Sequence, residues 1–521
     1  MDIHNEQPLV LEKAARWLAS NAKENRIPLL SAIAAGLLAY LFAFTNKLVN
    51  LDEVQYLLGK GATLDSGRWG LDILSYIFPD YSMPWIYGIL TLLLMAVAIC
   101  MIIHIFSVKS KLLQALLAAN IIVFPSLIGT FSYMFTTTAY ATSFLLAVLS
   151  VSLIQKPGKY KLYALGCMVL PLSIYQSYVA ITASMLVLVL IQQLLQEEHA
   201  AVVLKRGITY VIFLVVSLGI YFIATKLLLR FTSSDFNWYA TNNVQFSLQN
   251  IPSGIQAAYT YFFRILREGY LGLIPTELSL RIHHLCIAAL GILLLIWAAA
   301  RKDRKIADLL LLLVLFAVLP LAINCMYLIA SIDSIHTLVL YSFIAIYILA
   351  VILMEACLPL TNLSKYKRTC RRIAAEVVTI GLAVFIVVNT YIANASYLSL
   401  YLRYENAYAF YSSLTADIKM MPEFNEDTKL AVVGQYQSPD FYRDQFPFTQ
   451  HYIGITGVQG FSPDSYSKAC FLQYYIGFPI TCASYEEIEE IQMMPEYEAM
   501  PVYPYYGSMQ IIGDFLVVKL S

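Results

Sequence analysis

The segment of residues 50–70, NLDEVQYLLGKGATLDSGRWG, follows the first long apolar run and carries residue types that can do chemistry. Asp52 can take a proton from a hydroxyl group, or it can hold a divalent cation against a phosphate. Arg68 carries the planar guanidinium that suits two-pronged binding of a phosphate. The segment therefore predicts a base and an anion-binding group on one loop.

The neighbouring Glu53 has two interpretations. Asn50 and Glu53 have the spacing of a capping box, in which the Glu53 carboxylate returns to the Asn50 amide at the start of a helix. That explanation leaves Asp52 without a role, because its carboxylate projects from another face. The residues alone leave Glu53 open between a helix cap and a catalytic role, and they make Asp52 the candidate for the base.

Arg68 and Trp69 also fit more than one role. Asp65 and Asp72 lie three residues before and four residues after Arg68 and can form helical ion pairs with it. Trp69 fits an anchor at the membrane interface as well as a platform that stacks on a sugar ring. The residues alone favour the interfacial anchor for Trp69 and leave Arg68 open between an ion pair and a phosphate contact.

Polar side chains recur in the other predicted outer turns. The turn SIYQSYV places Tyr175 and Gln176 between two apolar runs, where polar residues usually face a cavity or a partner helix. His283, His284 and His336 precede later runs, where a histidine faces lipid headgroups or contacts a phosphate. The residues alone leave Tyr175 and Gln176 open between contact with a cavity and a plain interhelical hydrogen bond.

The composition is that of a membrane protein. The 521 residues are 59% hydrophobic and 13% charged, with a mean hydropathy of +0.66. A soluble domain would be about one quarter charged. The net charge of zero gives no indication of a nucleic-acid partner. The first 26 residues are polar and lack the apolar core of a signal peptide.

Eleven apolar runs predict a polytopic helical protein with about eleven transmembrane helices. Basic residues cluster in alternate connections, whereas the short turns between those connections carry none. The positive-inside rule therefore predicts a cytoplasmic N-terminus and an extracytoplasmic C-terminus. The runs are 27–46, 84–106, 112–130, 134–154, 161–174, 176–195, 207–229, 284–300, 306–329, 337–359 and 373–394.

This topology divides the chain into three parts. We predict a cytoplasmic segment 1–26, a transmembrane domain 27–394 and an extracytoplasmic domain 395–521. The transmembrane domain has two long outer loops, 47–83 and 230–283, whose short amphipathic helices are expected to lie along the interface.

The tail has the pattern of a small α/β domain. It contains a helix, a strand at KLAVVGQY, a second helix at SYEEIEEIQMM and a closing strand at DFLVVKL. Cys470 and Cys482 lie in this domain, either as a disulfide or as two free thiols. Its tyrosines fit either the domain core or stacking on an acceptor glycan; they include Tyr474, Tyr475, Tyr503, Tyr505 and Tyr506.

In their order along the chain, these features resemble the bacterial Gtr-type (type II) glucosyltransferase family. The acidic pair after the first run, GRWG, YQSY, ANASYLSLYLRYENAYAF and the ending MPVYPYYGSMQIIGDFLVVKL carry the resemblance, which extends from about residue 45 to the end. One departure is the Asp-Glu pair, where the family more often has Asp-Asp. It leaves open whether Asp52 or Glu53 acts.

The resemblance implies a membrane glycosyltransferase with a GT-C fold. Such an enzyme moves a glucosyl residue from a polyprenyl-phosphate carrier to a cell-surface glycan on the outer face. It also implies that Asp52 and Glu53 are the catalytic acidic pair, with Asp52 the better candidate for the base. It implies that the donor phosphate or sugar is bound by Arg68, Trp69, Tyr175 and Gln176, and it leaves a divalent cation at Asp52 open as a cofactor. The lipid-linked sugar already carries its leaving group, which agrees with the lack of a Rossmann or P-loop signature in the sequence.

Two other functions fit parts of the pattern. A transporter or flippase of lipid-linked glycans would explain the spans but not the acidic pair or the outer domain, and transporters often show matched repeats. A GT-C enzyme that uses another sugar fits equally well, because the sequence does not identify the contacts that would select the sugar.

Overall fold

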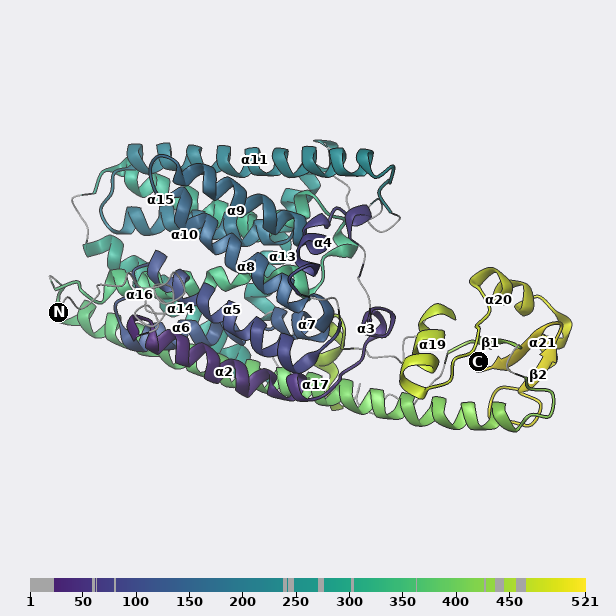
Figure 1. Ribbon diagram of the computed structural model, residues 1–521. Coiled ribbons are helices and arrows are strands. Elements are labelled where there is room, and N and C mark those ends of the chain that lie inside the picture. The colour runs from purple at the N-terminus through teal and green to yellow at the C-terminus, as the bar shows by residue number, and fades with distance from the viewer. Residues whose placement is uncertain are drawn as a thin grey trace, which may run out of the picture.

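The computed structural model describes residues 23–521 except 59–60, 62, 79–80, 238–240, 242–247, 270–275, 301–303, 362, 426–427, 436–444 and 456–464. Most of the predicted cytoplasmic segment 1–26 therefore lies outside the described residues. The described chain is mostly helical, with a small sheet near the C-terminus (Figure 1).

Within the described chain, nine helices are long and apolar enough to cross a membrane. Their exposed apolar side chains, such as Val211, Val215 and Phe222 on α11, fit contact with lipid. The nine are α2 (Arg26–Thr45), α5 (Pro84–Ile105), α8 (Met134–Ile154), α10 (Tyr178–Leu195), α11 (Ala200–Phe231), α14 (Glu277–Ala300), α15 (Ile306–Ile323), η6 (Thr337–Phe343) with α16 (Ile344–Cys357), and α17 (Lys365–Met420).

The predicted run 112–130 is not one straight helix. It forms α6 (Lys111–Ile122) and α7 (Ser126–Ser132), which meet at 51°. Pro125 at the junction cannot continue the hydrogen-bond ladder of α6. A total of eleven spans needs this bent pair and also the shorter α9 (Tyr160–Ile174), so the exact number remains a prediction.

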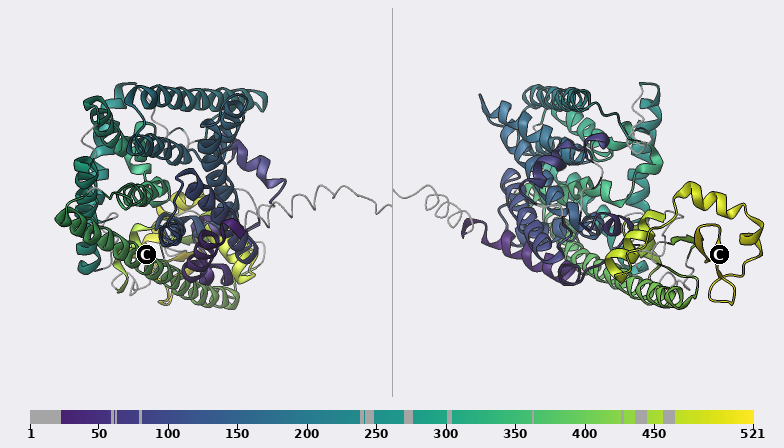
Figure 2. Two further views of the ribbon diagram at one scale, coloured as in Figure 1. Left: turned by 90° about the vertical axis from the view of Figure 1, so that its left-hand side faces the viewer. Right: turned by 45° about the vertical axis from the view of Figure 1, so that its right-hand side comes forward.

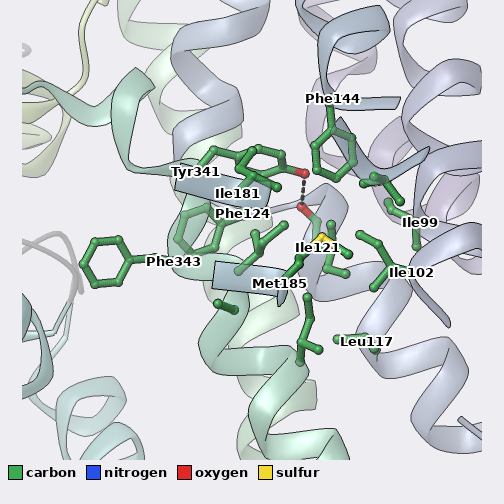
Figure 3. Packing of buried hydrophobic residues seen from close by; sticks show 14 of the residues in the cluster. Ile99, Ile102, Leu117, Ile121, Phe124, Phe144, Ile181, Met185, Tyr341 and Phe343 are labelled. Atoms are coloured by element: carbon green, nitrogen blue, oxygen red, sulfur yellow. Dashed lines mark hydrogen bonds between the residues drawn. The ribbon is translucent and has the colours of Figure 1, made fainter. Parts of the chain in front are cut away.

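Tyrosine hydroxyls satisfy the carbonyl groups that the bend exposes. Tyr341 donates to the Ile121 carbonyl at 3.1 Å (Figure 3), and Tyr40 donates to the Ile122 carbonyl at 3.0 Å. In the apolar interior such carbonyls have no water to bond. Around them pack buried side chains from α5, α6, α8 and α10, which hold the bundle together; they include Ile99, Leu117, Phe144 and Met185.

The two long loops, 47–83 and 230–283, contain short helices, as expected. The first holds α3 (Leu51–Gln55), η1 (Leu64–Ser66) and α4 (Trp69–Ser75). The second holds η2 (Leu248–Asn250) and α13 (Ile251–Glu268), whose buried apolar face includes Ala258 and Phe262. Two further short helices, η4 (Cys325–Leu328) and η5 (Ile332–Ser334), connect α15 to η6.

The predicted α/β character of the tail is confirmed. Strands β1 (Lys429–Val433), β2 (Met509–Ile512) and β3 (Phe515–Lys519) form a sheet in the order β1-β3-β2. β1 and β3 are parallel, whereas β2 and β3 form an antiparallel hairpin. The sequence did not predict β2. The sheet is accompanied by η7 (Pro447–His451), α19 (Ser465–Phe471), η9 (Leu472–Ile476), α20 (Tyr485–Gln492) and α21 (Pro495–Ala499).

The last span and the first helix of the tail are one element. α17 is a single helix of 56 residues, and the predicted domain boundary at 394/395 falls inside it. It runs along the bundle and reaches the C-terminal sheet (Figures 1 and 2). Cys470 and Cys482 beyond it are free thiols, as are the six other cysteines.

Candidate functional site

The acidic pair lies on α3, whose start is fixed by Asn50. The Asn50 side chain accepts a hydrogen bond from the Glu53 amide at 2.9 Å and donates to the Ser132 carbonyl at 2.6 Å. The first bond is half of a capping box. Asn50 is buried, so this cap also ties α3 to the end of α7.

The Glu53 carboxylate does not complete the capping box. It is completely buried and accepts hydrogen bonds from the Lys47 ammonium, from the Ser82 hydroxyl and, at 3.2 Å, from the Phe135 amide. Three donors from three other segments keep this carboxylate in place. Glu53 therefore supports α3, and its oxygens are engaged by the protein itself.

Asp52 has a different environment from its neighbour. Its side chain is half-buried, and burial together with the negative charge of Glu53 raises the pKa of Asp52 above the usual aspartate range. The positive charge of Arg68 acts in the opposite direction and lowers it. A carboxylate with a raised pKa is a stronger proton acceptor once it is ionised, as a general base requires.

The C-terminal domain supports α3 from the other side. Val49 and Val54 are fully buried in one apolar cluster with Leu414 of α17 and Phe471 of α19. Burial, with Glu53 nearby, raises the pKa of Tyr475. In Figure 1, α3 lies between the helical bundle and α19. The position of Asp52 therefore depends on the tail as well as on the bundle.

The second half of the loop is fastened to the bundle at Gly67. This residue has a φ of +75°, and a Cβ there would lie 2.7 Å from the Tyr221 hydroxyl. The Tyr221 hydroxyl donates to the Gly67 carbonyl at 3.0 Å and accepts a hydrogen bond from the Gln176 amide at 2.9 Å. Gln176 thus connects the loop to α11.

Arg68 and Trp69 extend from this turn. The Arg68 guanidinium lies over the Tyr175 ring, 5.2 Å from its centroid, and Tyr140 stacks on Tyr175 with centroids 4.8 Å apart. The Trp69 indole N–H donates to the Thr225 hydroxyl of α11 at 3.1 Å. Aromatic stacking and the α11 contacts restrict the orientation of both side chains.

These residues surround a cavity of about 660 Å³. Its walls are mainly apolar, contributed by α10, α11, η4 and the start of η6. Arg68, Tyr175, Gln176 and His336 add polar groups to the lining. The remaining lining residues are Ser66, Leu172, Ser177, Val179, Leu218, Gly219, Tyr221, Phe222, Thr225, Phe236, Thr241, Met326, Ile329, Ala330, Ser334, Ile335 and Val339.

The structure brings together part of the predicted set. Arg68, Tyr175 and Gln176 line the cavity, and Trp69 is bonded to Thr225 of its wall. Asp52 and Glu53 are not lining residues; Asp52 is linked to the cavity through the charge of Arg68. The predicted groups therefore form two neighbouring clusters that Arg68 connects.

The histidines of the predicted outer turns separate into two kinds. His283 bonds the Leu266 carbonyl at 3.1 Å and His284 bonds the Arg267 carbonyl at 2.7 Å, so both fasten α14 to the end of α13. His336 instead lines the cavity. The sequence had left it open between a headgroup contact and a phosphate contact.

The residues around Asp52 give little support for a protein-held metal. Across the described ranges, no group of three or more His, Cys, Asp or Glu residues is arranged to hold an ion. The oxygens of Glu53, the other member of the acidic pair, are engaged by Lys47, Ser82 and the Phe135 amide. These residues do not fit a dedicated cation site, and we derive no chemical step through a metal.

The tail tyrosines are also of two kinds. Tyr475 stacks on Phe471 with centroids 5.2 Å apart, and the Tyr503 hydroxyl donates to Asp417 at 2.8 Å, so both belong to the domain core. Tyr474, Tyr505 and Tyr506 are exposed. Stacking on an acceptor glycan remains a prediction for the exposed three.

A family model described as Glucosyl transferase GtrII matches residues 41–354. No curated protein and no solved structure matches the chain. The matched region contains the acidic pair, the Gly67 turn, Arg68, Tyr175, Gln176 and the cavity that they border.

Proposed function

Because the chain belongs to the GtrII glucosyltransferase family, we propose that it moves a glucosyl residue from a polyprenyl-phosphate carrier to a cell-surface glycan on the outer face of the membrane. The family supports the glycosyltransferase activity, and the long apolar helices support the membrane location. The lipid carrier, the side of the membrane and the roles of individual residues are our proposal.

The cavity beside Arg68 is the observation that carries the proposal. Its volume of about 660 Å³ and its mainly apolar walls fit a lipid chain, and the Arg68 guanidinium fits the phosphate that joins the chain to the sugar. A nucleotide-linked donor would need polar contacts for a base and a ribose, which these walls do not favour. The mainly apolar lining therefore supports a lipid-linked donor.

The proposed chemistry uses the two clusters in one step. Asp52 accepts the proton of the acceptor hydroxyl while the oxygen of that hydroxyl forms a bond to the anomeric carbon of the sugar. The bond between that carbon and the phosphate oxygen breaks, and the polyprenyl phosphate leaves with an additional negative charge. Arg68, in the lining of the cavity, stabilises this developing charge.

Four further residues would act by positioning the reacting groups: Glu53, Trp69, Tyr175 and Gln176. Glu53 holds α3, and therefore Asp52, by its bonds to Lys47 and Ser82. Tyr175 supports the guanidinium from one face, and Gln176 fixes the Gly67 turn through Tyr221. Trp69 is bonded to Thr225 in the cavity wall.

A donor comparison tests the proposal. Purified protein is given polyprenyl-phosphate glucose or a nucleotide-linked glucose, with the acceptor glycan present in both reactions. We expect transfer from the lipid-linked donor alone. Transfer from the nucleotide-linked donor without any lipid carrier would contradict the proposal, and polyprenyl-phosphate mannose as a third donor tests the choice of sugar.

Labelling of introduced cysteines tests the side of the membrane. Tyr76→Cys and Tyr506→Cys are exposed sites in the first outer loop and in the tail, and Tyr366→Cys is an exposed site at the start of α17. A membrane-impermeant maleimide added to intact cells should label the first two and leave the third unlabelled. Labelling of Tyr366→Cys with protection of the other two would reverse the topology.

A further inference from the structure

His336 is a polar residue of the cavity that the proposed chemistry does not use. It caps η6 directly before the span Thr337–Cys357, and its ring lines the cavity together with Arg68. Its Nδ1 atom is buried and has no hydrogen-bond partner among the described residues. Because buried polar atoms almost always have a partner, this atom points to a ligand contact.

Other polar side chains around the cavity are engaged by the protein. The Gln176 amide and the Tyr221 hydroxyl bond each other and the Gly67 turn. The Thr225 hydroxyl accepts from Trp69, and the Ser334 hydroxyl donates to the Ser331 carbonyl at 2.7 Å. His336 differs from these four residues because its Nδ1 atom has no hydrogen-bond partner among the described residues.

The charge state of His336 restricts what it can bind. Burial, together with the positive charge of Arg68, lowers the pKa of His336 to about 4. The ring is therefore neutral near pH 7, and a neutral imidazole carries one N–H donor and one acceptor nitrogen. Beside a fixed guanidinium, an anion is the favourable partner for such a donor.

We propose that His336 is a second contact to the phosphate of the lipid-linked donor, with its Nδ1–H donating to a phosphate oxygen while Arg68 binds the same group. The inference rests on the proposed function, because it assigns one more residue to that donor site. In the described chain, Arg68 comes from the first outer loop and His336 from the connection between α15 and η6. A phosphate held by both would therefore join two segments that are far apart in the sequence.

Two substitutions separate the hydrogen bond from the packing. His336→Leu keeps most of the apolar volume and removes the donor, whereas His336→Asn places an amide N–H close to the position of Nδ1. A hydrogen bond to a charged group is worth about 1.5–3 kcal/mol, so we expect His336→Leu to weaken donor binding by about 10- to 100-fold. His336→Asn should stay within about threefold of the wild type. Ser331→Ala, in the same connection but outside the cavity lining, is the control and should also stay within about threefold.

Binding is measured directly, with polyprenyl monophosphate and the corresponding polyprenol as probes for purified protein in detergent. We expect the loss in His336→Leu to appear with the phosphate probe and to be absent with the alcohol. The Michaelis constant for the donor should rise in parallel, with a smaller change in turnover. If His336→Leu does not fold, His336→Gln takes its place, because its amide lies beyond the Nδ1 position.

The outcomes distinguish this inference from the proposed function. If the wild type neither binds the phosphate probe nor transfers from the lipid-linked donor, the proposed function fails. If the wild type does both and His336→Leu binds the phosphate probe equally well, the inference about His336 is wrong. An Asn variant as weak as the Leu variant would also overturn the assignment to Nδ1.

Discussion

The two ends of the first long loop, residues 47–83, are supported by different parts of the molecule. The end that carries Asp52 packs through Val49 and Val54 into the apolar core of the C-terminal domain. The end that carries Arg68 is fastened to α11 through Gly67 and Trp69. A candidate base and a candidate phosphate ligand thus lie on one loop but depend on two separate supports.

A second contrast lies within the acidic pair. Glu53 is completely buried with its oxygens bonded to protein donors, whereas Asp52 is half-buried and influenced by the charge of Arg68. Adjacent carboxylates with such different surroundings suit different tasks. We therefore expect substitution of Asp52 to affect turnover and substitution of Glu53 to affect stability.

The largest effect is expected for Asp52→Asn. This change keeps the size of the side chain and removes the proton acceptor, so turnover should fall by about 10²- to 10⁴-fold. The midpoint of thermal unfolding should not fall, because the burial of Asp52 disfavours the negative charge that the substitution removes. Transfer from polyprenyl-phosphate glucose and thermal unfolding in detergent measure the two quantities.

Asp65→Asn is the matched control for that change. Asp65 lies in the same loop, and its carboxylate accepts a hydrogen bond from Asn237 at 3.1 Å. We expect its turnover to stay within about threefold of the wild type, because Asp65 does not line the cavity and the amide oxygen of Asn can still accept the bond from Asn237. Near-normal turnover in Asp52→Asn would contradict the assignment of the base.

Glu53→Gln should have the largest effect on folding. It removes a buried charge that pairs with Lys47, and breaking one partner of a buried ion pair costs about 3 kcal/mol. The chemical denaturation midpoint in detergent should fall accordingly. Glu277→Gln, which breaks an exposed pair with Arg281, should cost less than about 1 kcal/mol.

The outcome for Glu53→Gln separates the two carboxylates. If Glu53→Gln is as stable as the wild type and nevertheless loses turnover by orders of magnitude, Glu53 is the base. The contrast between a supporting carboxylate and a reacting carboxylate would then be reversed.

Substitutions of Arg68 test the link between the two ends of the loop. The guanidinium lowers the pKa of Asp52, so Arg68→Gln should raise that pKa further. Because the base works in its ionised form, the acid limb of the pH dependence of kcat/KM should move to higher pH. Arg68→Lys keeps the charge, so the acid limb should move less, while the Michaelis constant for the donor rises.

A pH profile of each Arg68 variant from about pH 4 to 8 measures the shift. An unchanged acid limb in Arg68→Gln would mean that Arg68 does not influence the group that controls the rate. The loop would then carry two independent clusters.

The smallest effect is expected for Thr225→Val. It keeps the volume but removes the acceptor of the Trp69 indole N–H, at a cost of about 1 kcal/mol. Donor binding should weaken by less than tenfold, with little change in turnover. Thr209→Val on the same helix removes a comparable bond to the Lys205 carbonyl and should leave donor binding unchanged.

The sequence predicted features that depend on local patterns. Apolar runs located the spanning helices, and turn and strand patterns located β1, β3 and α20. The Asn50 cap also follows from its neighbours in the chain. The short β2, with an exposed Ile511, lacks a strong strand pattern and was missed.

The sequence did not predict features set by distant residues. Glu53 has the spacing of a capping box, but Ser82 and the Phe135 amide, both remote in the chain, bond its carboxylate. Likewise, His336 reaches the cavity because the connection through η4 and η5 folds beside α10 and the first long loop. The spacing of residues along the chain carries no signal for such contacts.

The length of α17 has a mechanical consequence. At 1.5 Å per residue, 56 residues span about 84 Å, nearly three times the apolar thickness of a bilayer. The part after residue 394 is then a stiff arm of about 39 Å, and a tilt of about 10° would displace its end by about 7 Å. Transmembrane helices tilt further in thinner bilayers, so bilayer thickness would act on the distance between the C-terminal sheet and the lipid surface.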